Sequence, residues 1–329
     1  MLIRPELQAL RGDDAPQHLA QYGLAEVTQR WRDQSGASVA AAELARFAAG
    51  AELEDLPVLA ALFAPGDPSA AEFVAGLVAV QTAQLAARPL AQVTMRHYCD
   101  DVVSSLIVAR HGTANLVLQA IDGAGLARKP APEAVNFFPT ETWEQVMAGS
   151  AEVERVLLVG QRPGAADLTR APMRLVPGMV CHRFGLDEAQ LLRRVPGSLV
   201  TLKLQRRIGA DDVVRQFSLA DGSQVHQSAA SPRDSRLELA AALLGRMGRS
   251  DAAPLLVAMA EEEAATPLRW QVLRECLALD TAAGFAALSR LAARTGDPLA
   301  VPAGALRAQL LESYPQLAAC DDGARSCPV

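Results

Sequence analysis

The chain has 329 residues, half of them apolar but only 4% aromatic, and its formal net charge is −6. This length is typical of two or three domains with substantial hydrophobic cores. Ala and Leu supply most of the apolar residues, which favours helices. The acidic balance, without a strongly basic segment, excludes nucleic acid as an expected partner.

The cysteines are few, odd in number and widely scattered: Cys99, Cys181, Cys276, Cys320 and Cys327. This pattern argues against a disulfide framework and indicates a reducing compartment. Cys320 and Cys327 by themselves supply too few ligands for a closed zinc site.

Neither a secretory signal nor a membrane span is predicted. The first residues, MLIRPELQALRGDD, lack the apolar segment of a signal peptide. The longest apolar stretch, residues 70–87, is interrupted by Glu72, Gln81 and Gln84, and it falls short of the length that a span requires. We therefore expect a soluble, cytoplasmic protein with no membrane partner.

Residues 1–90 are expected to form an N-terminal helical segment. Leu24, Val27 and Trp31 recur at helical spacing, and Pro65-Gly66-Asp67-Pro68 is a strong break before a further helix. That last helix either packs on the domain that follows or binds a partner through its apolar side chains.

Residues 91–231 are expected to form an antiparallel β domain. Its clearest strand is residues 198–206, where Val200, Leu202 and Leu204 alternate with polar residues. Asp221-Gly222 predicts a hairpin turn. Further strand-like runs, separated by Gly and Pro turns, lie at residues 93–98, 102–109, 115–121, 152–159, 173–176, 179–184, 190–194, 213–219 and 224–228.

One helix is expected inside this domain. Thr140 has the character of an N-cap, Trp143 and Met147 are spaced to pack inward, and Gly149 ends the pattern. Residues 122–139, which are rich in Gly and Pro, are expected to form a loop before it.

A helical pattern returns after Ser231 and predicts a third domain at residues 232–317. Its helix pairs resemble HEAT-type repeats, which implies a surface that binds other macromolecules; a compact helical lid on the β domain is the alternative. Residues 318–329 are expected to be a disordered tail. The apolar stripes place these residues in the helical core: Leu237, Leu243, Leu244, Leu255, Leu273, Leu277 and Leu288.

The short strands with Pro-Gly turns between residues 93 and 228 resemble a cupin-type jelly roll. The predicted fold class is therefore α+β, with N-terminal helices, an antiparallel jelly-roll-like β domain and C-terminal HEAT-like helices. Metal-binding cupins carry two His separated by one residue, then a Glu, and a later His after a Pro-x-Gly turn. This chain has no such pair, and His182 follows Pro177-Gly178 at a different spacing. The resemblance implies the barrel and not the metal centre.

Two groups of potentially reactive side chains stand close together in the sequence. His97, Cys99, Asp100 and Asp101 form either part of a metal site or an ordinary strand-to-turn segment. Cys181 and His182 are neighbours, so as strand residues they face opposite sides and do not form a nucleophile–base pair.

No phosphate-binding loop or Gly-x-Ser-x-Gly motif is present in the sequence. The densest basic region is expected to be a solvated face, and an anion site is the alternative. Its members are Arg193, Arg194, Lys203, Arg206 and Arg207.

The leading functional hypothesis is non-enzymatic binding, in a regulatory or scaffolding role, through a β-domain pocket or the helical-repeat surface. It needs no cofactor and no metal, and its partner is another protein or a small ligand. The alternative is a cupin-type metal-dependent enzyme, a dioxygenase or isomerase. Its candidate ligands are His97, His111, His182 and His226, and His97 with His182 is the first pairing to inspect.

Overall fold

The computed structural model describes residues 7–8, 10–209, 213–262 and 264–320. The chain forms two compact units. The first comprises Met1–Val135, Thr140–Ile208 and Leu219–Gly222, and the second comprises Asn136–Pro139, Gly209–Ser218 and Ser223–Val329. The N-terminal helices therefore share a unit with most of the strands. The predicted boundaries at residues 90, 231 and 317 separate helical from strand-rich segments, whereas the two units are separated by their packing. These boundaries therefore stay a prediction.

The N-terminal segment is helical, as predicted. Its core side chains include Leu44, Phe47 and Leu77, which pack with Leu202 and Leu204 of the sheet described next. The helices are α2 (Ala15–Arg32), α3 (Ser35–Ala48), α4 (Pro57–Leu62) and α5 (Ser69–Ala87), with a 3-10 turn η1 (Leu53–Asp55) before α4.

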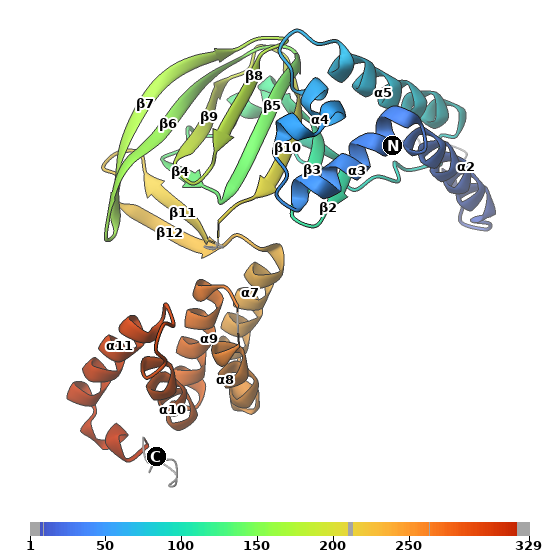
Figure 1. Ribbon diagram of the computed structural model, residues 1–329. Coiled ribbons are helices and arrows are strands. Elements are labelled where there is room, and N and C mark those ends of the chain that lie inside the picture. Colours follow the sequence, from blue (N-terminus) through green and yellow to red (C-terminus); the bar gives the residue numbers. More distant parts are fainter. Residues whose placement is uncertain (1–6, 9, 210–212, 263, 321–329) are drawn as a thin grey trace. The chain divides into compact units, whose positions relative to one another are not determined.

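Among the strands that follow, eight pairs within the described residues are antiparallel. They form a six-stranded sheet in the order β1-β2-β3-β10-β5-β8 and three-stranded sheets in the orders β7-β6-β9 and β12-β11-β4 (Figure 1). The strands are β1 (His97–Cys99), β2 (Val103–His111), β3 (Ala114–Asp122), β4 (Ala134–Phe137), β5 (Thr140–Ala148), β6 (Ala151–Arg162), β7 (Ala165–Leu175), β8 (Val180–Phe184), β9 (Glu188–Arg194), β10 (Ser198–Arg207), β11 (Val213–Ser218) and β12 (Gln224–Ala229).

The six-stranded sheet is the middle layer of the first unit. One face, the helix-covered face, carries Leu202, Leu204 and Trp143 and packs against α3, α4 and α5 (Figure 1). The opposite face packs against the β7-β6-β9 sheet, through a core that includes Val146 and Val153. Strands β5 and β10 are therefore buried on both sides.

The helix predicted from Thr140 to Gly149 is wrong, because these residues form strand β5. All residues from Glu141 to Val146 are buried, so the strand shows no alternation of apolar and polar residues. Gly149 makes the turn into β6 with a φ of 79°. A Cβ there would lie 1.9 Å from the carbonyl oxygen of Ser198, so only glycine fits.

Two further expectations about the β region need correction. The predicted loop at residues 122–139 contains the short helix α6 (Gly123–Ala127) and strand β4. The predicted strand at residues 93–98 is reduced to His97–Cys99. The hairpin at Asp221-Gly222 is confirmed, since β11 and β12 pair across it and Gly222 has a φ of 72°.

In the second unit, helix α9 (Thr266–Leu279) packs against α7, α8 and α10, and α11 packs against α10. Their shared core includes Leu273, Leu288 and Phe285, all fully buried. The helices are α7 (Pro232–Arg246), α8 (Ala253–Glu261), α9 (Thr266–Leu279), α10 (Thr281–Ala292) and α11 (Ala300–Ser313), with 3-10 turns η2 (Ser250–Ala252) and η3 (Pro315–Cys320). The helices are as predicted, whereas their HEAT-like character stays a prediction.

Part of the predicted C-terminal core is wrong. Leu243 and Leu255 are 55% and 60% exposed, and Leu244 is only half-buried. The first three residues of the predicted disordered tail belong to η3, and residues 321–329, with Cys327, lie outside the described residues.

Helix α5 is, by length and composition alone, apolar enough to cross a membrane, contrary to the expectation for this stretch. A single helix of this kind is weak evidence, because core helices of soluble proteins pass the same test. Here α5 packs on α2, and its buried Gln81 amide donates a 2.8 Å hydrogen bond to the Thr28 hydroxyl. The carbonyl oxygen Oε1 of Gln81 is also buried and has no hydrogen-bond partner among the described residues, so this hydrogen bond satisfies only part of the amide.

Candidate functional site

The four candidate histidines do not form one site. His97 on β1 and His182 on β8 lie on opposite edge strands of the six-stranded sheet, so the pairing first considered is wrong. His111 ends β2 at the hairpin to β3, and His226 lies on β12 in the other unit. Among the residues that the structure describes, no three His, Cys, Asp or Glu side chains gather into a group that could hold a metal.

The segment from His97 to Asp101 makes a strand-to-turn connection. The Asp100 carboxylate accepts 2.7 Å hydrogen bonds from the backbone N–H groups of Val102 and Val103, and these bonds lower its pKa. The Cys99 sulfur lies 3.1 Å from the Ser104 hydroxyl oxygen. These contacts give Asp100 a structural role in the turn.

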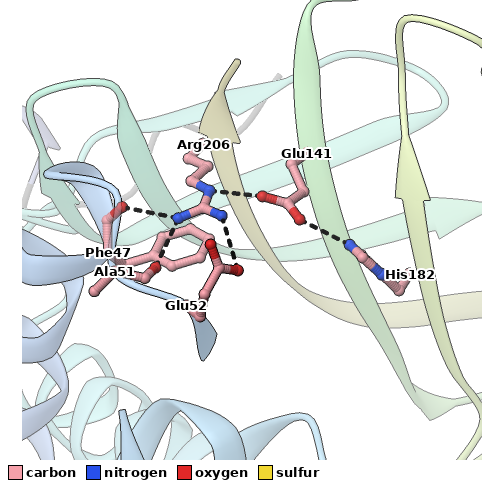
Figure 2. Close-up of polar contacts among 6 residues, drawn as sticks. All are labelled: Phe47, Ala51, Glu52, Glu141, His182 and Arg206. Carbon is pink, nitrogen blue, oxygen red and sulfur yellow. Dashed lines mark hydrogen bonds and ion pairs between the residues drawn. The ribbon is translucent and has the colours of Figure 1, made fainter. Parts of the chain in front are cut away.

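Three strands place Glu141, His182 and Arg206 together on the helix-covered face, and we call this group the Glu141 cluster (Figure 2). Glu141 pairs with Arg206 across β5 and β10, and residues paired in this way share a face. Nε of Arg206 donates to Oε2 of Glu141 at 2.6 Å, and Nε2 of His182 lies 3.0 Å from Oε1. The buried carboxylate thus holds one guanidinium and one imidazole.

The Glu141 cluster also joins the sheet to the end of α3 (Figure 2). Nη1 of Arg206 donates to the carbonyl oxygen of Ala51 at 2.7 Å, and the guanidinium lies 4.4 Å from the centre of the Phe47 ring. Arg206 is nearly buried, so these contacts replace the water it would otherwise bind. The cluster therefore fixes α3 on the sheet.

His182 is the only member of the cluster with substantial exposure, at 40% of its side chain. Its ring stacks on Trp143 at 4.1 Å and meets Phe184 edge-on at 4.9 Å. An oriented, exposed imidazole can act as a general base if a reacting group lies beside it. Its neighbour Cys181 points to the opposite face, as predicted, and burial raises the pKa of that thiol.

A second charged group, the Glu144 cluster, lies on the opposite face of the same strands and contains Glu144, Arg183 and Lys203. Glu144 accepts from Nη1 of Arg183 at 2.8 Å and lies 3.1 Å from Nζ of Lys203. Burial raises the pKa of the Glu144 carboxyl, but the two cations outweigh it and the pKa falls to about 2. Burial also lowers the pKa of Lys203. The single carboxylate is thus shared by two cations, which offsets part of the cost of burying them between the two sheets.

The solvated face expected for the basic residues of β9 and β10 is therefore wrong for Lys203 and Arg206, which are buried in ion pairs. Arg193 pairs with Glu154, and Arg194 pairs with Glu152 on the surface. Arg207 also has an interaction partner. Among the described residues, four of these five basic side chains are thus paired with a carboxylate.

A cavity of about 400 Å³ lies between the N-terminal helices and strand β2. Its walls are apolar, with Trp31, Phe73 and Leu116 among them, and three arginines line it: Arg32, Arg96 and Arg110. We call it the arginine cavity. All three arginines are exposed, and their side chains make no hydrogen bond or ion pair with the residues that the structure describes. Sequence reasoning missed this site because its arginines come from three separate elements.

An adjoining cavity of about 390 Å³ continues between α3, α4 and α5. It shares Trp31, Ala37 and Phe73 with the arginine cavity, and it extends along Leu62 and Gly76. We call the two cavities together the helix groove. The Trp31 and Phe73 rings meet edge-on at 5.3 Å and form the wall that both cavities share.

No family model matches the sequence, and no curated protein matches it significantly. Several solved structures are similar to about a third of the chain. KdgF from Halomonas sp. is 18% identical, with 34% of this chain and 88% of that chain covered and a TM-score of 0.24. A cupin superfamily protein from Desulfitobacterium hafniense is 13% identical, with 34% and 83% covered and a TM-score of 0.23. Ectoine synthase from P. lautus is 12% identical, with 34% and 70% covered and a TM-score of 0.23.

One of these structures is thus a cupin superfamily protein, the family that the strand pattern resembles. The identities and TM-scores are low, so these similarities carry no argument about activity, ligand or metal.

Proposed function

We propose that this protein is a non-enzymatic binding protein and that the helix groove is its ligand site. The observation that carries the proposal is the pair of adjoining cavities, each near 400 Å³, that share Trp31, Ala37 and Phe73. Mostly apolar concavities of this size with a few polar groups at one end are typical of small-molecule sites.

The charged residues of the β region support a structural role more than a catalytic one. Glu141 and Glu144 are buried, and each is bound by two cationic or imidazole partners. A catalytic metal needs about three protein ligands and an open position. The described residues contain no such group, so the cupin-type enzyme remains the second candidate.

A helical surface is the second binding site to consider. Leu239 and Leu243 of α7, and Met247 directly after its end, recur every four residues and are 70%, 55% and 58% exposed. An exposed apolar stripe of this kind favours a protein partner. Sedimentation velocity tests it with a second copy of the chain as partner: self-association that Leu243→Glu abolishes supports the surface, and a monomer at every concentration removes this support.

A neutral apolar dye such as Nile red tests the groove itself. Gly76 lies in the wall of the adjoining cavity, and a Cβ there would meet only Nε1 of Trp31, at 3.7 Å. Gly76→Leu should therefore fill the cavity and abolish the rise in dye fluorescence. Gly304→Leu is the matched control, because Gly304 is also helical and has open space around it. Equal dye binding by the wild type and both variants contradicts the proposal.

A further inference from the structure

We infer that the ligand of the helix groove is an amphipathic anion, with an apolar chain held beside Trp31 and Phe73 and a carboxylate held by the arginines. This inference rests on the function proposed above, since it specifies the ligand of the same groove. It draws on the charge of the arginine cavity, the chemistry of its walls and the way the two cavities meet.

The arginine cavity has an excess of positive charge. Arg32 ends α2, Arg96 precedes β1 and Arg110 lies near the end of β2, so three elements bring three guanidinium groups to one rim. No Asp or Glu lines this cavity. Arginine stays protonated at any physiological pH and binds carboxylates through two parallel hydrogen bonds. The rim therefore favours an anionic head group.

None of the carboxylates that the structure describes forms an ion pair with these three arginines. The carboxylate of Asp33, next to Arg32, accepts a 2.9 Å hydrogen bond from the Gln29 amide. Glu72 lines only the adjoining cavity and is exposed on α5. The charge excess thus lies at one end of the helix groove and not along its whole length.

The walls of the helix groove suit an apolar chain. Trp31 is only 5% exposed, Ala40 and Leu116 are buried beside it, and Phe73 closes the wall. Beyond Phe73 the adjoining cavity continues along Ala61 and Leu62. An apolar chain held in the arginine cavity can therefore contact Trp31 and Phe73, whose rings also line the adjoining cavity beside α4 and α5.

Other ligand classes fit the helix groove less well. A neutral apolar ligand would gain nothing from three arginines, while inorganic phosphate would gain nothing from the apolar walls. A sugar or nucleotide needs several hydrogen-bonding groups around its hydroxyls. Apart from the arginines, the arginine cavity is lined only by Ala, Val, Ile, Leu, Phe and Trp side chains. A medium-chain carboxylate fits both features, because its head group can bind the arginines and its chain can contact the apolar walls.

Isothermal titration calorimetry with sodium dodecanoate, below its micelle concentration, tests the inference on the full chain. Dodecan-1-ol is the neutral probe of equal length. We expect dodecanoate to bind more tightly than dodecan-1-ol. Added salt should reduce this difference in affinity, because it screens the charge of the carboxylate head group. The double variant Arg96→Gln/Arg110→Gln should weaken dodecanoate about tenfold, as expected for two partly exposed ion pairs. The same variant should leave the affinity for dodecan-1-ol unchanged.

Matched controls separate this inference from the proposed function. Arg46→Gln removes an exposed arginine of α3 that lies outside the groove lining and should leave binding unchanged. Equal affinity for the two probes, with no effect of the double arginine variant, overturns the anionic ligand but leaves groove binding intact. Binding of neither probe by the wild type, or binding that Gly76→Leu leaves unchanged, overturns both.

Discussion

Replacing Glu144 by Gln should destabilise the protein, and the loss should depend on pH. The buried Glu144 carboxylate stands between Lys203 and Arg183, and its pKa is lowered from 4.5 to about 2. Each unit of pKa difference between the unfolded and folded chain corresponds to about 1.4 kcal/mol, so ionised Glu144 contributes about 3 kcal/mol. Removing one partner of a buried ion pair typically costs about the same.

The sign of the pH dependence follows from the lowered pKa. Between pH 2 and 4.5 the folded chain binds fewer protons at Glu144 than the unfolded chain. The contribution is therefore complete above pH 4.5 and is lost as the pH falls toward 2. At pH 3 less than half of it is left, so the gap between wild type and Glu144→Gln should shrink by about 2 kcal/mol from pH 7 to pH 3.

Urea titrations at pH 7 and pH 3, followed by tryptophan fluorescence, measure this difference. Glu152→Gln is the matched control on β6, the next strand in sequence, because Glu152 and Arg194 form a 3.1 Å ion pair with both side chains exposed. That pair should contribute less than about 1 kcal/mol. A Glu144→Gln variant as stable as wild type at pH 7, or a gap that is the same at both pH values, would refute the reasoning.

Three further outcomes are expected. The Thr201 hydroxyl is fully buried and has no hydrogen-bond partner within the described residues, so Thr201→Val should raise the free energy of unfolding by about 1 kcal/mol; a decrease in urea melts would show that the hydroxyl is satisfied. Asp297 and Arg269 form a 2.6 Å ion pair and are 10% and 7% exposed. Asp297→Asn should lower the free energy of unfolding by about 3 kcal/mol, because Arg269 stays buried without its counterion. A urea melt identical to that of the wild type would contradict this. Elemental analysis of gently purified protein should find no stoichiometric transition metal, and near-stoichiometric iron, manganese, nickel or zinc lost on His182→Ala would favour the enzyme instead.

The sequence predicted those strands whose two faces differ. Strand β10 alternates Leu202 and Leu204 on the helix-covered face with Lys203 on the other, so its period of two is plain. Strand β5 is buried on both faces, and polar residues occur on both of them. Its sequence therefore lacks the alternation of apolar and polar residues that identifies a strand. The spacing of Thr140, Trp143 and Met147 then resembles a helix, although tertiary pairing makes it a strand.

The two charged clusters could not be predicted for the same reason. In a strand Glu141 and Glu144 point to opposite faces, where each meets basic side chains that lie about 40 to 65 residues away along the chain. Cys181 and His182 were correctly expected to face opposite sides, because that conclusion needs only the strand and its period. The helix groove depends on three arginines whose proximity is set by tertiary packing alone.

The most direct test of groove binding uses the three tryptophan indole N–H signals in a ¹H–¹⁵N spectrum, which belong to Trp31, Trp143 and Trp270. Trp31 lines both cavities of the groove, and neither cavity is lined by Trp143 or Trp270. On titration with dodecanoate the Trp31 signal, assigned through Trp31→Phe, should shift to saturation while the other two stay in place. Saturable binding that leaves Trp31 unmoved, or that shifts Trp143 or Trp270 instead, would contradict the assignment of the ligand site to the helix groove.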